Sequence, residues 1–328
     1  MIRVVRIGER ARQALARSRG EAIALAGFAG GPYFAAAGEL IWVGARLPAM
    51  HPRAVITEDS PVGDTVLHFV HLPAQGWMPR PSRPGRSTAA RIAANAGTLC
   101  RAVLAADAPR GFGALLAGAM PAFPLDLAVA RVQALARAYR QADAHAVLSA
   151  SIALLGIGAG LTPSGDDLAG AALFGRRLLA PRTRAWEDVA EQLAREAGQR
   201  SHAISAALLG DLVRGESFAP LHAIAEALAA DDHAAALAAA RNLTPIGHSS
   251  GWDMFTGLVI GITGSLGDGA KLAAQRGRER HEQHGRRRRR KAPAIAQAKE
   301  LRGGRYSGER RARLAHRRGQ RRRLTRAP

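Results

Sequence analysis

The sequence has little of several features that would place it in a narrow class of protein. It has one cysteine, Cys100, which excludes an intrachain disulfide framework and leads us to expect a reducing compartment, the cytoplasm. Aromatic residues make up only 5% of the 328 residues. No apolar run reaches the roughly 18 residues that a membrane-spanning helix needs, because the runs near residues 147–161 and 254–266 are interrupted by glycine. We therefore expect a protein without a membrane span.

Lysine is almost absent, and the positive charge is unevenly spread. All three lysines lie past position 270, and residues 271–328 hold 22 of the 47 Lys and Arg residues but only four acidic ones. The net charge of +21 therefore does not indicate a nucleic-acid-binding domain. The arginine runs at 286–290 and 321–323 would bind phosphate backbones only non-specifically. We interpret residues 271–328 as a disordered basic tail, or as the product of a frameshift at the end of a GC-rich gene.

Composition divides the remainder into two parts. Residues 1–84 contain an arginine-rich start with weak helical spacing, short apolar runs of strand length such as 39–43 and 66–70, and a proline-rich linker at 73–86. Residues 85–270 show apolar stripes of helical period at 87–106, 124–140, 185–198, 201–214 and 220–230. This pattern predicts an α+β fold in which a small N-terminal mainly-β region packs on a larger helical domain, followed by the basic tail.

The most informative stretch is LLGIGAGLTPSGDDLAG, residues 154–170, which we call the first signature. Its alternating glycines allow a backbone to approach a ligand or another backbone closely. Thr162 precedes Pro163 and is therefore expected to be extended, so that Ser164 could cap a helix with Asp167 in its first turn. A helix N-terminus offers unpaired N–H groups to an anion. The candidate anion-binding residues here are Gly158, Gly160, Thr162, Ser164, Gly165 and Asp167.

The second signature, LTPIGHSSGWD at residues 243–253, repeats this pattern with four residues inserted. Ser250 and Asp253 have the same spacing as Ser164 and Asp167, so a second helix start is expected. Small residues behind both starts, including Gly257 and Gly261, would let the two helices approach closely. We expect the two signatures to meet at one cleft, with Ser249, Ser250 and Gly251 as further anion-binding candidates.

The candidate catalytic residues are Asp166, His248 and Asp253. Asp167 and Asp253 could either cap their helices or contact a ligand. Asp166 has no local capping task, which makes it the favoured residue for chemistry or metal contact. His248 could act as an acid or base, or could simply be an exposed turn residue. Neither signature contains Lys or Arg, so the charge of an anion must be met by N–H groups, hydroxyls, or a divalent ion such as Mg²⁺ held by Asp166 and a partner.

Three strings carry a family resemblance: GAGLTPSGDD at 158–167, ISAALL at 204–209 and GHSSGWD at 247–253. Together they resemble the family, long of unknown function, that includes the AllH-type subunit of oxamate carbamoyltransferase. The resemblance covers about residues 20–267. It implies carbamoyl transfer between oxalurate and phosphate in allantoin catabolism, a small anionic substrate and companion subunits. The alternative is a non-catalytic scaffold or ligand-sensing subunit in which the same glycines only hold two helices together.

Overall fold

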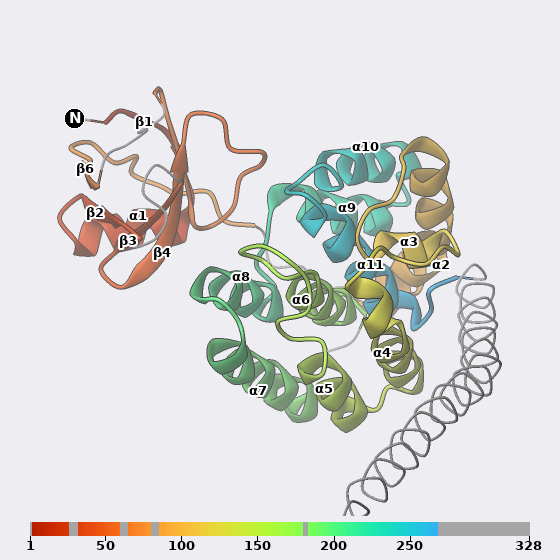
Figure 1. Cartoon of the computed structure of the whole chain (residues 1–328). Helices are drawn as coiled ribbons and strands as arrows, with labels where there is room; N and C mark the ends of the chain where they lie inside the picture. The colour runs from red at the N-terminus through yellow and green to blue at the C-terminus, as the bar shows by residue number, and fades with distance from the viewer. Residues whose placement is uncertain (1, 26–31, 60–64, 80–84, 180–182, 268–328) are drawn as a thin grey trace, which may run out of the picture. The chain divides into compact units, whose positions relative to one another are not determined.

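A computed structural model describes residues 2–25, 32–59, 65–79, 85–179 and 183–267. A curled six-stranded sheet forms the N-terminal region and a larger set of helices follows it, which confirms the predicted α+β fold (Figure 1). Contacts group Met1–Ala273 into one compact unit. The predicted division near residue 84 stays a prediction, and the predicted basic tail lies outside the described residues.

The sheet has the strand order β1-β5-β4-β3-β2-β6. Neighbouring strands are antiparallel except β4 and β5, which are parallel, and an isolated bridge between Ile2 and Phe69 links the two edges. The helix α1 buries Ala11, Ala14 and Leu15 against the sheet. The strands and this helix are β1 (Val4–Ile7), α1 (Glu9–Arg17), β2 (Glu21–Ala24), β3 (Tyr33–Ala36), β4 (Glu39–Gly44), β5 (Ala54–Thr57) and β6 (Val66–His68).

The helical part follows the linker and contains most of the expected helices. Its elements are α2 (Arg86–Ala106), α3 (Gly113–Leu116), η1 (Leu125–Ala128), α4 (Val129–Gln141), α5 (Ala144–Ile152), α6 (Ser164–Arg177), α7 (Arg184–Arg200), α8 (Ala203–Arg214), α9 (Ala219–Ala230), α10 (His233–Leu243) and α11 (Ser250–Thr263). The stripe at 124–140 begins as the 3₁₀ turn η1 before α4. Helices α5 and α10 have no separate stripe among those predicted from the sequence.

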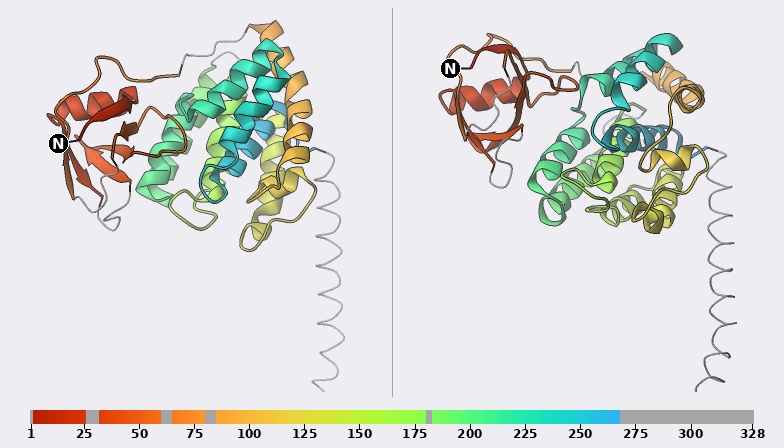
Figure 2. Two further views of the ribbon diagram at one scale, coloured as in Figure 1. Left: turned by 90° about the horizontal axis from the view of Figure 1, so that it is seen from above. Right: turned by 45° about the horizontal axis from the view of Figure 1, so that its top comes forward.

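Helices α6 and α11 lie side by side in the middle of the helical part (Figures 1 and 2). Both have 14 residues, and the residues from the start of α6 to Gly175, like those from Gly251 to Ile262, are buried. A Cβ atom added at Gly261 would lie 1.9 Å from the carbonyl oxygen of Ala172, and one at Gly257 would lie 2.2 Å from that of Leu168. The backbones therefore touch at these glycines, as expected from the small residues behind the two signatures.

Candidate functional site

The two signatures meet, although their paired hydroxyl groups lie 88 and 85 positions apart in the sequence. Thr162 Oγ1 lies 2.9 Å from Ser250 Oγ, and Ser164 Oγ lies 3.3 Å from Ser249 Oγ. Each contact joins one residue of the first signature to one of the second. The expectation that the two glycine loops converge is thus confirmed at the level of side chains.

The convergence is reciprocal. The hydroxyls of Ser250 and Thr162 lie near the carboxyl group of Asp167, and those of Ser164 and Ser249 lie near that of Asp253. Each helix therefore places its acid beside the serine that begins the other helix. The loops before the helices repeat this symmetry, since the N–H of Gly165 donates to the carbonyl of Ile157 and the N–H of Gly251 donates to that of Ile246.

These contacts correct the expected capping. The N-cap of α6 is Pro163, so Ser164 is the first helical residue and its side chain caps nothing. Ser250 likewise lies inside α11, whose N-cap is Ser249. The reason is that the hydroxyls of both serines are drawn across to the other helix. The first-turn N–H groups of Gly165 and Gly251 are also used within the protein, so they do not form the open anion site that the pattern suggested.

Asp166 and Asp167 face different directions, because neighbouring residues on a helix are about 100° apart. Asp166 Oδ1 accepts a hydrogen bond of 2.7 Å from the N–H of Gly156, and its Oδ2 accepts one of 2.6 Å from Ser205. Ser205 belongs to ISAALL at 204–209, the second string of the family resemblance. Asp166 is 1% exposed and thus ties the first signature to α8. Both oxygens of Asp166 accept hydrogen bonds from the protein, and Asp166 does not line the cavity, whereas Asp167 does.

Asp167 is the acid that reaches a cavity. Burial, reinforced by the nearby charge of Asp253, raises its pKa well above the usual value, although the hydroxyls of Ser250 and Thr162 oppose the shift. Its Oδ2 is buried and receives no well-aligned hydrogen bond from the described residues. Burial therefore favours the protonated form of this carboxyl group, the form that can donate a hydrogen bond.

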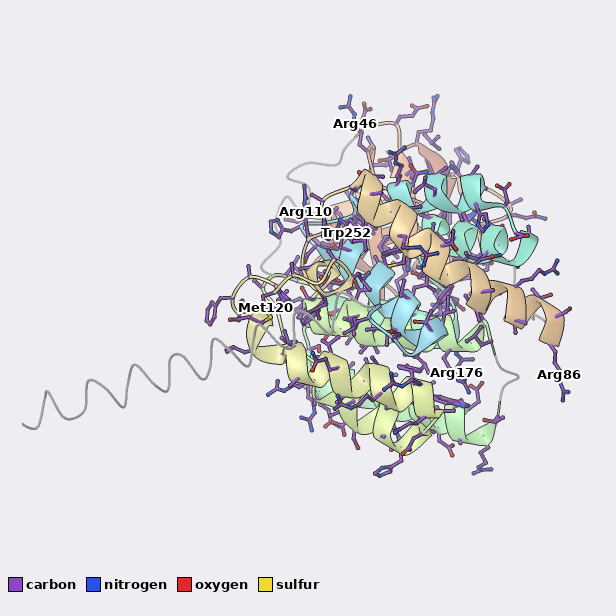
Figure 3. The ribbon with its side chains drawn as sticks, turned by 90° about the vertical axis from the view of Figure 1, so that its right-hand side faces the viewer. Arg46, Arg86, Arg110, Met120, Arg176 and Trp252 are labelled. Carbon is purple, nitrogen blue, oxygen red and sulfur yellow. The ribbon has the colours of Figure 1, made fainter. Side chains whose placement is uncertain are left out.

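Asp253 of α11 is fully buried and does not line the cavity. Its Oδ1 accepts a hydrogen bond of 2.7 Å from the N–H of Phe112, and Gly111 packs directly against the same oxygen. Burial raises the pKa of Asp253 to about 7, against the opposing effect of the Phe112 bond. The neighbouring Trp252 packs on Gly113, close to the segment of Arg110 (Figure 3). The segment at 111–113 therefore covers Asp253.

The remaining candidates separate into loop positions and one exposed side chain. Gly158 has φ +119°, and a Cβ atom there would lie 2.6 Å from the nitrogen of Ser164, so the loop requires glycine. Gly160 has φ +96° and open space around it. His248 is exposed and is not among the residues that line the cavity. Its catalytic role stays a prediction without a contact to support it.

The cavity has a volume of ≈ 110 Å³. The matched pair of signatures contributes Thr162, Asp167, Gly247 and Ser250 to its wall. The other lining residues come from the sheet region and from neighbouring helices: Tyr33, Leu40, Trp42, Pro48, His51, Arg53, Leu208, Phe218, Ile246 and Met254. The cavity is thus small, largely apolar, and supplied with one buried acid and several hydroxyl groups, as small-ligand sites usually are.

Sequence reasoning missed the charged cluster that borders this cavity. Arg53 is buried and binds Asp211 of α8 through Nε and Nη2, while its Nη1 donates to Glu39 at 2.8 Å. Arg10 and Arg214 also lie within ion-pair distance of Asp211. The hydrogen bond and charge of Arg53 keep the pKa of Asp211 below its usual value, although burial acts in the opposite direction. The one available signal was a lone carboxylate in the apolar stretch of residues 203–214.

The residues at the site do not fit a divalent cation. In the described parts of the chain, no group of three or more His, Cys, Asp or Glu side chains is arranged to hold a metal ion. Asp166, the expected ligand, already accepts hydrogen bonds at both oxygens. Burial disfavours the charged form of Asp167, which is the form that would bind a cation. We therefore derive no step through Mg²⁺.

The α+β fold thus places a small cavity beside its central helix pair, where the two signatures meet. Residues 154–262 match the model of one protein family, described as oxamate carbamoyltransferase subunit AllH. This match confirms the resemblance over the segment that contains α6, α8 and α11. No curated protein and no solved structure matches the chain. Among the described helices, none is long and apolar enough to span a membrane.

Proposed function

We propose that this protein is a subunit of an oxamate carbamoyltransferase-like enzyme and that the cavity beside Asp167 binds its small anionic substrate. The reaction is carbamoyl transfer between oxalurate and phosphate in allantoin catabolism. Companion subunits, which the family description implies, complete the enzyme. We also propose a cytoplasmic location, in keeping with the single cysteine.

The observation that carries this proposal is the reciprocal pairing of the signatures within the matched segment. The pairing brings Thr162, Asp167 and Ser250 from positions far apart in the sequence to one wall of a cavity. The arrangement places a buried acid with a raised pKa beside two partly buried hydroxyl groups. Such groups are the donors that a carbonyl needs when it develops negative charge in acyl transfer.

The chemistry balances with the groups present. An oxygen of hydrogen phosphate attacks the terminal carbamoyl carbon of oxalurate, and the bond from this carbon to the inner nitrogen breaks. The nitrogen leaves with oxamate and takes up one proton, while phosphate gives up one proton. Asp167 would donate the proton to the leaving nitrogen and recover one from phosphate, as a general acid does. Thr162 and Ser250 share a hydrogen bond, so one of these two hydroxyls would donate to the other and the second would donate to the oxyanion at the carbamoyl carbon.

The test is turnover by the full chain together with its companion subunits. Asp167→Asn keeps the size of the side chain but removes the transferable proton, so kcat should fall by about 100-fold or more. Asp188→Asn changes an exposed acid of α7 in the same way and should leave kcat unchanged. Equal turnover by wild type and Asp167→Asn would contradict the proposal.

A non-catalytic scaffold is the second candidate, and one observation favours it. Gly175, Gly257 and Gly261 serve the contact between α6 and α11, and Asp166 serves the contact with α8, so part of each signature is explained by packing alone. Binding distinguishes the two functions. Oxamate, oxalurate or carbamoyl phosphate should raise the thermal midpoint of the isolated chain if the cavity is a true site, and should not if the protein is a scaffold.

A further inference from the structure

One side of the cavity is formed by aromatic rings from two regions of the chain. Trp42 of β4 stacks on Tyr33 of β3, with ring centroids 6.2 Å apart and planes 13° from parallel. The edge of Phe218 meets Trp42 at 5.7 Å, and His51 lies 4.8 Å from Phe218. All four side chains line the cavity. We call this set, Tyr33, Trp42, His51 and Phe218, the aromatic wall.

The aromatic wall is held in place by buried contacts. The N–H of Trp42 donates to the carbonyl of Arg53 at 2.8 Å, and the N–H of Ala219, next to Phe218, donates to the carbonyl of Met50 at 2.8 Å. The ion pair between Arg53 and Asp211 fastens the same segment to α8. These contacts fix the segments that carry the rings, which favours binding because little freedom is lost when a ligand contacts them.

Charge contributes little to recognition at this wall. Arg53 already holds Asp211 and Glu39. Burial lowers the pKa of His51 to about 4, with Asp211 opposing the shift, so this ring is neutral at physiological pH. The wall therefore offers shape and aromatic contact, while hydrogen bonds come from Asp167, Thr162 and Ser250 elsewhere in the cavity.

We propose that Trp42, stacked on Tyr33, selects flat carbamoyl compounds over those with a tetrahedral carbon in their backbone. The sheet region then decides which substrate the cavity accepts, although it lies outside the matched segment 154–262. A planar ureido or amide group can lie against an aromatic face, whereas a tetrahedral carbon holds part of the molecule away from it. This inference rests on the proposed function for the identity of the site and adds the residue that sets its specificity.

The chain contains a matched control for this experiment. Trp186 of α7 stacks on Tyr139 with ring centroids 6.1 Å apart and planes 7° from parallel, and neither residue lines the cavity. Trp186→Leu therefore removes a similar stacked ring at a different place. Trp42→Phe keeps an aromatic face in the cavity, and Trp42→Leu removes it.

Binding of two probes to the full chain measures the selection. The probes are oxalurate, which is flat, and N-carbamoylglycine, in which a CH₂ group replaces one carbonyl. We expect wild type to prefer oxalurate, and Trp42→Leu to reduce the ratio of the two dissociation constants about tenfold, the factor that one aromatic contact of ~1.4 kcal/mol provides. Trp42→Phe should retain most of the preference, and Trp186→Leu should retain it fully.

Three outcomes would overturn the inference. They are equal affinity of wild type for both probes, binding of neither probe, and the same change of ratio in Trp42→Leu and Trp186→Leu. The proposed function has its own test in the turnover of Asp167→Asn, so it would stand even if the aromatic wall did not select. Suppose that Asp167→Asn abolishes turnover while Trp42→Leu leaves the ratio of the two dissociation constants unchanged. The cavity is then the catalytic site, but the aromatic wall does not select between the two substrates.

Discussion

At the scale of single residues, two adjacent acids of one helix turn have different tasks. Asp166 accepts hydrogen bonds from Gly156 and Ser205 and fixes the loop, while Asp167 lies beside Ser250 at the cavity. Asp253 occupies the equivalent position of the second helix but is covered by Phe112. The equivalent acids of the two signatures therefore differ: Asp167 lines the cavity, and Asp253 is enclosed.

Asp253→Asn should change how stability depends on pH. The folded pKa of Asp253 is raised to about 7 from 3.8, so the stabilisation is fully present below pH 3.8 and is lost as the pH rises through 7. Between pH 5 and pH 8 the wild type should lose about 2 to 3 kcal/mol relative to the variant. Urea unfolding of both proteins at the two pH values measures this. Parallel pH dependence would show that Asp253 is not held in its protonated form.

At the scale of elements, the site depends on how closely two helices approach. The carbonyls of Leu168 and Ala172 in α6 lie where side chains at Gly257 and Gly261 of α11 would be. A larger residue there would separate the helices and with them the hydroxyl contacts between Thr162 and Ser250. The same glycines therefore determine both the stability of the helix pair and the width of the site.

Gly261→Ala should destabilise the protein by about 2 to 3 kcal/mol, because the new methyl group would lie 1.9 Å from the carbonyl oxygen of Ala172. Gly198→Ala is the matched control, since Gly198 is a helical glycine of α7 with nothing within 4 Å of the added atom. This control should gain up to ~1 kcal/mol from helix propensity. Thermal unfolding of both variants checks the prediction, which fails if the two changes have the same sign.

At the scale of the whole molecule, a buried charge cluster joins the sheet region to the helical part. Asp211 of α8 pairs with Arg53 from the segment before β5, and Arg10 of α1 binds Glu216 at 2.6 Å beside it. The aromatic wall depends on this junction, because Arg53 follows His51 by two residues. A variant that breaks the ion pair between Arg53 and Asp211 should therefore lose both the attachment of the sheet region and the proposed substrate selection.

Asp211→Asn should destabilise the protein by about 3 to 5 kcal/mol, because it leaves the buried guanidinium of Arg53 without its carboxylate. The folded pKa of Asp211 is lowered, so the stabilisation is present above its unfolded pKa and is lost as the pH falls through the folded pKa. The variant should therefore lose less stability than wild type on acidification. Denaturation of wild type and Asp211→Asn at pH 7 and pH 3 measures this difference in stability. Asp188→Asn, a change at an exposed acid, is the control.

The sequence by itself determined the fold class and the pairing of the signatures. Strand-length runs and helical stripes follow from local periodicity, and the repeated Leu-Thr-Pro and Ser-Gly-x-Asp pattern already indicated two equivalent helix starts. The small residues at 257 and 261 likewise indicated a close approach of two helices, although only the structure shows that they meet the carbonyls of Leu168 and Ala172.

Only the tertiary structure decided which acid lines the cavity. Spacing left Asp167 open between a cap and a ligand contact and favoured Asp166 for chemistry, whereas the packing of α6 places Asp166 against Ser205 and Asp167 at the cavity. Spacing also could not place Tyr33, Trp42 and Arg53 beside a loop more than 100 residues away. The physical reason is that burial, hydrogen-bond partners and pKa depend on which surfaces meet in space, and a linear pattern carries that information only where the meeting residues are close in sequence.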